Sequence, residues 1–94
     1  MLKITTHENA KTVCLRLEGT LKGAWVPEME ECWRRAALDR NKALIVDLSE
    51  VEFVDTAGRY LLELMHARGA SFVTVTPLMS QLVADIAAHS GLPH

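Results

Sequence analysis

The chain has 94 residues, of which 49% are hydrophobic and 23% charged; this length and composition indicate one globular domain over residues 1–94 and exclude a disordered chain or a second core. The net charge of −2 gives no broad attraction to nucleic acid or anionic lipid. Because the start lacks a signal-peptide pattern and no apolar stretch approaches the roughly 18–20 residues that span a bilayer, we expect a cytoplasmic protein without membrane insertion.

Two strands are predicted at the start of the chain. Leu2 and Ile4 alternate with polar residues, and the apolar residues from Val13 to Leu17 alternate in the same way. This period of two is typical of strands with one wet face. With residues 7–12 as the turn, the two strands should form an antiparallel pair.

A helix is expected next, within residues 24–40. Its acids come early and its arginines late, which complements the helix dipole, and its apolar stripe is Val26, Met29, Trp33 and Ala37. The continuous apolar run 43–48 then predicts a strand that is covered on both sides or central in a parallel sheet.

Helix and strand alternate through the rest of the chain. A helix is predicted over residues 56–68, with Gly69 as its stop signal, and a strand over residues 71–75. The last helix should be capped by Thr76, opened by Pro77 and stopped near Gly91. The predicted core residues of these two helices are Ala57, Leu61, Leu64, Met65, Leu78, Leu82, Val83 and Ile86.

Short connections between alternating strands and helices imply parallel pairing with right-handed crossovers. The predicted fold class is therefore α/β, in the order β-β-α-β-α-β-α. Its sheet should be mixed and mainly parallel, with an antiparallel pair at the start and helices after the later strands.

The segment FVDTAG (53–58) is the candidate functional corner. It leads from the middle strand to the carboxyl edge of the sheet, where open α/β sheets usually meet ligands and partners. Either Asp55 or Thr56 is a good N-cap for the helix that follows.

The stretch LIVDLSEVEFVDTAGRYLLEL (44–64) resembles the signature of the STAS domain, the family of bacterial anti-sigma-factor antagonists. LEGTL (17–21) is similar to the turn after the family's second strand, and VTPLMSQLVADIAAHSGL (75–92) to its final helix. The resemblance implies a STAS-like fold and a non-enzymatic regulatory module whose partner is an anti-sigma kinase or a similar switch protein. The residues in register with the signature are Asp47, Ser49, Val51, Phe53, Asp55 and Gly58.

Two positions depart from the members of the family that act as phosphoswitches. A serine kinase modifies the second hydroxyl residue of their Asp-Ser-Ser-Gly corner, and the matching position here is Ala57, which has no oxygen to phosphorylate. Lys22 stands where those members carry an acid. Thr56 is the remaining hydroxyl at the corner, as a structural first-turn residue or as an alternative phosphorylation site.

The predicted partner-binding residues are Asp55, Thr56, Ala57, Gly58 and Arg59, with Lys22 and Trp25 alongside. Trp25 is interpretable as a lid on the core or as an interface anchor, and Arg59 as an ion-pair partner of Glu63 or as a contact. Tyr60 and Leu62 would form a modest apolar patch or lie beneath a neighbouring helix.

Two other functions remain open. An Asp-Thr corner resembles the STAS subunit of bacterial ABC-type lipid transport complexes, which docks on an ATPase, and some STAS domains bind nucleotides or other small ligands. The histidines and the two cysteines show no metal-ligand spacing, and no nucleophile motif is present, so we expect no metal, no cofactor and no enzymatic activity. A bare strand edge would favour a homo-oligomer.

Overall fold

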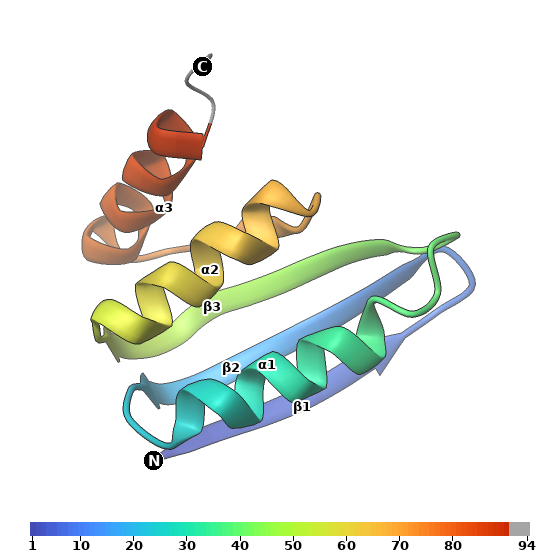
Figure 1. The fold of residues 1–94 in the computed structure, drawn as a ribbon, viewed down its shortest axis with the longest axis horizontal. Coiled ribbons are helices and arrows are strands. Elements are labelled where there is room, and N and C mark those ends of the chain that lie inside the picture. Colours follow the sequence, from blue (N-terminus) through green and yellow to red (C-terminus); the bar gives the residue numbers. More distant parts are fainter. Residues whose placement is uncertain (91–94) are drawn as a thin grey trace.

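The computed structural model describes residues 1–90, and the predicted helix stop at Gly91 lies outside them. The expected order of strands and helices is confirmed (Figure 1). The elements are β1 (Leu2–Glu8), β2 (Thr12–Leu21), α1 (Trp25–Ala36), β3 (Ala43–Val54), α2 (Thr56–Ala67), β4 (Ser71–Val73) and α3 (Pro77–Ser90).

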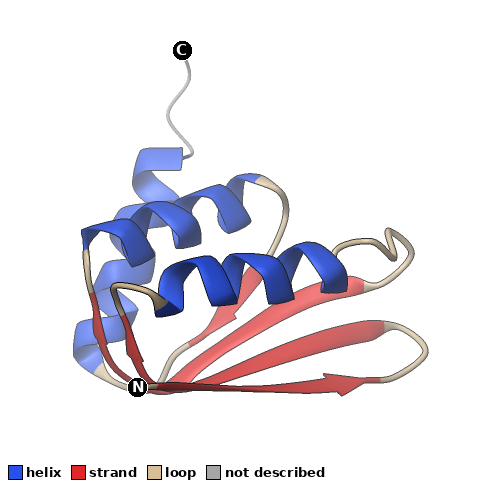
Figure 2. Cartoon of the chain, turned by 60° about the horizontal axis from the view of Figure 1, so that its bottom comes forward, coloured by secondary structure: helices blue, strands red, loops and turns tan. Residues whose placement is uncertain are grey.

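The sheet has the order β1-β2-β3-β4. β1 pairs antiparallel with β2, whereas β2 with β3 and β3 with β4 pair parallel, which confirms the predicted mixed sheet. β3 is therefore a central strand. Helices α1 and α2 cover one face of the sheet (Figure 2), and α3 packs beside α2.

The core lies between this face and the helices. Alternate residues of β2 are buried, from Val13 to Leu17, while Cys14, Arg16 and Glu18 between them are half-exposed on the other face. The period of two in the sequence thus separates a dry face from a wet one, as predicted. From the helices, the core receives Val26, Met29, Trp33, Leu61, Leu62, Met65, Met79 and Ile86.

The middle strand is longer than the apolar run that predicted it. The expected end at residue 48 is wrong, because β3 continues to Val54 beside an equally extended β2. Glu50 and Glu52 lie on this extension with exposed side chains, while Val51 between them is buried. The register shifts beside Gly19, whose φ of 106° suits the irregular pairing.

Three helix assignments also change. Leu78 was expected in the core but is 67% exposed, and its neighbour Met79 is buried instead. Ala57 was also expected in the core but is exposed. Of the two interpretations of Leu62, burial beneath neighbouring elements is confirmed, because its side chain is fully buried. Ala37 is exposed and only caps α1, because the helix ends at Ala36. The predicted strand 71–75 is shorter and ends at Val73.

The end of α2 shows why Gly69 stops it. The Gly69 N–H donates to the carbonyl of His66 at 3.0 Å, and the Ala70 N–H donates to that of Met65 at 3.0 Å. These two bonds form a Schellman motif, which requires a left-handed residue. Gly69 supplies it with a φ of 98°.

Candidate functional site

A single carboxylate ties the corner together. Asp55 follows β3 in an extended conformation and is the N-cap of α2, with its Oδ1 accepting the Gly58 N–H at 2.7 Å. Its Oδ2 accepts the Gly23 N–H at 2.9 Å, from the turn between β2 and α1. Asp55 rather than Thr56 is thus the cap, and it also joins two segments that are 32 residues apart in the sequence.

The backbone of Asp55 adds a third link. Its N–H donates to the carbonyl of Leu21, the last residue of β2, at 3.1 Å. The ends of β2 and β3, the turn at Gly23 and the first turn of α2 therefore meet at one edge of the sheet (Figure 1, left). Sequence reasoning placed these segments at one corner but gave no sign of the bond between Asp55 and Gly23.

These contacts favour the ionised form of Asp55. The hydrogen bond from the Gly23 N–H, followed by that from the Gly58 N–H and the charge of Lys22, lowers the pKa of this carboxyl below its ordinary value. Because the pKa of Asp55 is lower in the folded chain, the link stabilises the fold at pH values above the ordinary carboxyl pKa. This stabilisation is lost as the pH falls through the lowered pKa. Because backbone donors occupy both oxygens, Asp55 acts as a structural link.

Gly58 allows α2 to approach the end of β2 closely. It is buried, and a Cβ added there would lie 2.7 Å from the Leu21 carbonyl oxygen and 2.9 Å from Val54 Cγ1. No side chain fits into this space without a shift of the backbone. Gly58 was predicted among the contact residues, but its place beneath the corner gives it a shaping role.

The other predicted residues remain accessible. Lys22, Thr56 and Ala57 are exposed, whereas Trp25 and Arg59 are half-buried. We call these five residues the corner surface. Trp25 is half-buried and packs against the core, which agrees with its interpretation as a lid, and its role as an interface anchor stays a prediction.

Arg59 and Tyr60 continue the accessible surface along the first turns of α2. Tyr60 is 66% exposed and extends the corner surface along the helix. Arg59 and Glu63, both described, form no ion pair, unlike Arg34 with Glu30 and Arg35 with Glu31 on α1. The guanidinium of Arg59 is therefore not held by the acid one turn along its helix.

The rest of the motif is structural. Asp47 Oδ1 accepts from the Ser49 hydroxyl at 2.5 Å and from the Ser49 N–H at 2.9 Å. The hydroxyl bond is the main cause that lowers the pKa of Asp47. Val51 is buried in the core, and Phe53 is 49% exposed near the end of β3. Asp47 and Ser49 thus satisfy each other within β3, away from the corner surface.

Among the side chains that the structure describes, no three of His, Cys, Asp or Glu are grouped so that they could ligate a metal ion. Both cysteines are free and half-exposed. Within residues 1–90, no helix is long and apolar enough to cross a membrane.

Comparison with known proteins places this geometry in a family. The model of the STAS domain matches residues 2–71. An anti-sigma factor antagonist from Mycobacterium paratuberculosis superposes with a TM-score of 0.82 at 18% identity, covering 99% of this chain and 84% of that one. Comparison with curated protein sequences gave no match.

Two further solved structures share the fold. The anti-sigma factor antagonist SpoIIAA in its unphosphorylated form has a TM-score of 0.64 at 18% identity, covering 96% of this chain and all of that one. An antisigma-factor antagonist STAS domain from Rhodobacter sphaeroides has a TM-score of 0.57 at 20% identity, with 79% and 85% covered.

Proposed function

This chain belongs to the STAS domain family, and from that premise we propose that it is a non-enzymatic regulatory module that binds a partner protein through its corner surface, as an anti-sigma-factor antagonist. The partner would be an anti-sigma kinase or a similar switch protein of the bacterial cytoplasm. The observation that carries the proposal is the exposed turn of Thr56 and Ala57, held in place by the Asp55 carboxylate.

The rigidity of the corner supports a binding role. Asp55 fixes the start of α2 and the turn at Gly23 before any partner arrives. A surface that is already ordered loses little conformational entropy on association, and more of its contact energy therefore appears as affinity. Tyr60 and the exposed part of Trp25 supply the aromatic contacts that interfaces favour.

Ala57 determines how such binding is regulated. A phosphate at this position would add about −1.5 to −2 charges beside Asp55, but alanine has no oxygen to carry one. The corner surface is therefore fixed in the state equivalent to an unmodified switch. Control would come from the abundance of the protein or from a competing partner, unless a kinase modifies Thr56, whose side chain is exposed.

A charge substitution tests this proposal. Ala57→Glu places a carboxylate on the corner surface, and Ala87→Glu makes the same change at an exposed position of α3. With a purified anti-sigma kinase in isothermal titration calorimetry, we expect Ala57→Glu to weaken binding about tenfold or more and Ala87→Glu by less than about twofold. Equal affinities for the two variants would refute docking at the corner.

The Asp-Thr sequence of the corner favours one alternative partner, the ATPase of an ABC-type lipid transporter. An exposed Thr56 beside a capping Asp55 supports docking on either protein. Co-purification distinguishes them: an ABC ATPase retained by the tagged chain supports the transport complex, and a kinase retained in its place supports the antagonist. The variants Ala57→Glu and Ala87→Glu test docking at the corner surface with either partner protein.

A further inference from the structure

A basic cleft with a volume of about 650 Å³ lies between the end of α1, the start of β3 and the turn after α2. These three segments are at the end of the molecule opposite the corner surface, on the right in Figure 1. Four lining residues of the cleft are cations and one is an acid: Arg34, Arg40, Lys42 and Arg68, with Asp39. The lining is thus richer in cations than the whole chain, whose net charge is −2.

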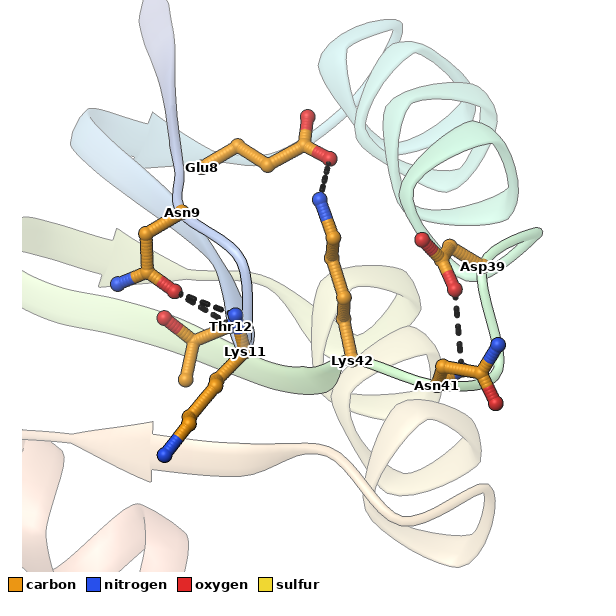
Figure 3. A network of polar contacts seen from close by, with 7 residues as sticks. All are labelled: Glu8, Asn9, Lys11, Thr12, Asp39, Asn41 and Lys42. Carbon is orange, nitrogen blue, oxygen red and sulfur yellow. Dashed lines mark hydrogen bonds and ion pairs between the residues drawn. The ribbon is translucent and has the colours of Figure 1, made fainter.

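Two of the four cations are already neutralised. The guanidinium of Arg34 pairs with Glu30 at 2.8 Å, and the Lys42 ammonium pairs with Glu8 on β1 (Figure 3). Arg40 and Arg68 form no ion pair with any residue whose side chain the structure describes, and both are exposed. These two guanidinium groups are therefore available to an anion inside the cleft.

The acid among the described lining residues is hydrogen-bonded within its own turn. Asp39 Oδ1 accepts the Asn41 N–H at 3.0 Å within its own turn (Figure 3). The Lys42 N–H donates to the Asp39 carbonyl at 3.3 Å, and the Ala43 N–H donates to the Lys11 carbonyl at 2.9 Å. The last of these bonds ties the start of β3 to the hairpin of β1 and β2, and the ion pair of Lys42 with Glu8 ties the turn to β1, so this side of the cleft is held before a ligand enters.

Part of the cleft lining is apolar. Leu38 lines it with an 80% exposed side chain and Leu44 with a half-buried one, whereas Trp33 is only 3% exposed. Beside Arg68, Gly69 leaves open space, since a Cβ built there meets no atom within 4 Å. The cleft thus combines accessible apolar side chains, two free guanidinium groups and backbone that a ligand can approach. Its volume is within the range of small-molecule sites.

We propose that this cleft binds a small organic phosphate, with the phosphate bound by Arg40 and Arg68 and an apolar body against Leu38 and Leu44. Guanidinium groups bind phosphate oxygens through paired, charge-assisted hydrogen bonds. The site is separate from the corner surface, and the proposal does not depend on the partner that docks there.

Isothermal titration calorimetry of the full chain in about 150 mM salt tests the site with three probes: ADP, inorganic pyrophosphate and adenosine. We expect ADP to bind and adenosine not to bind, because the two guanidinium groups supply most of the affinity. Weaker binding of pyrophosphate than of ADP would support the apolar contact, whereas equal affinities of the two would overturn that part of the proposal. Absence of binding by both phosphates at millimolar concentrations would overturn the proposal.

A pair of matched variants locates the binding. Arg40→Gln/Arg68→Gln removes the two free cations of the cleft, and Lys3→Gln/Lys11→Gln removes two exposed cations that do not line it. The cleft variant should lower the affinity for ADP about tenfold or more, and the control variant should lower it by less than about twofold. Equal loss in both variants would mean unspecific attraction and would overturn the site. All four side chains are exposed, and circular dichroism of each variant confirms folding.

Discussion

Substitution of Gly58 by alanine tests whether close contact between α2 and the end of β2 sets the corner. A Cβ at this position would lie 2.7 Å from the Leu21 carbonyl oxygen, 2.9 Å from Val54 Cγ1 and 3.0 Å from Leu21 Cγ. The first contact is with backbone, which cannot rotate away as a side chain can. Either the start of α2 or the end of β2 must therefore move.

The size of the effect follows from two opposing terms. Forcing an extra carbon into a well-packed site costs about 1–3 kcal/mol. Alanine is a better helix former than glycine by up to about 1 kcal/mol, and this gain offsets part of the cost. We expect Gly58→Ala to lower the free energy of unfolding by about 0.5–2 kcal/mol.

Urea unfolding followed by circular dichroism measures this change. Ala84→Gly, at an exposed position inside α3, is the control, because it changes helix propensity alone and should cost about 0.5–1 kcal/mol. Amide NMR spectra should also show a shifted Gly23 N–H in Gly58→Ala, since its bond to Asp55 depends on the position of α2. A Gly58→Ala variant as stable as the original chain, with an unmoved Gly23 signal, would refute the reasoning.

Two further predictions concern the same region. Asp55→Ala should lower the free energy of unfolding at neutral pH. The difference in this free energy between the variant and the original chain should shrink as the pH falls below the ordinary carboxyl pKa of about 3.9, because protonation removes the same link. A pH-independent difference in urea midpoints would contradict this. Leu62→Ala should lower the free energy of unfolding by about 2–5 kcal/mol, because Leu62 is fully buried. Tyr60→Ala, two residues away, should change it by less than about 0.5 kcal/mol. Similar losses for the two variants would contradict the assignment of the buried and exposed faces of α2.

The order of elements was predictable because it depends on local patterns. The alternation around Val13 and Leu15, the helical stripe through Met29 and Trp33 and the stop at Gly69 each report a neighbourhood of a few residues. These local preferences agree with the final fold, which is the usual condition for a sequence to specify one structure.

The misplaced residues depend on long-range packing. Glu50 and Glu52 suggest a loop because they are charged, but they lie on the exposed side of a strand whose partner β2 continues to Leu21. Leu62 lies off the helix stripe read from the sequence and is nevertheless fully buried, in a helix that packs against both β3 and α3. No pattern within a single element contains these contacts.

The candidate site was also predictable only in its local features. The motif identifies Asp55 and the accessible positions Thr56 and Ala57, because a cap and a turn are local features. The bond from Gly23 to Asp55 joins segments 32 residues apart, and the basic cleft gathers Arg40 and Arg68 from separate turns. Neither arrangement has a sequence signature.

Hydrogen exchange measured by mass spectrometry, with and without a saturating anti-sigma kinase, is the most direct test of docking at the corner surface. We predict that binding slows exchange in residues 22–25 and 55–60 and leaves residues 38–44, beside the basic cleft, unchanged. Protection confined to the cleft or to β1, with none in residues 55–60, would contradict the proposal that the corner surface is where the partner binds.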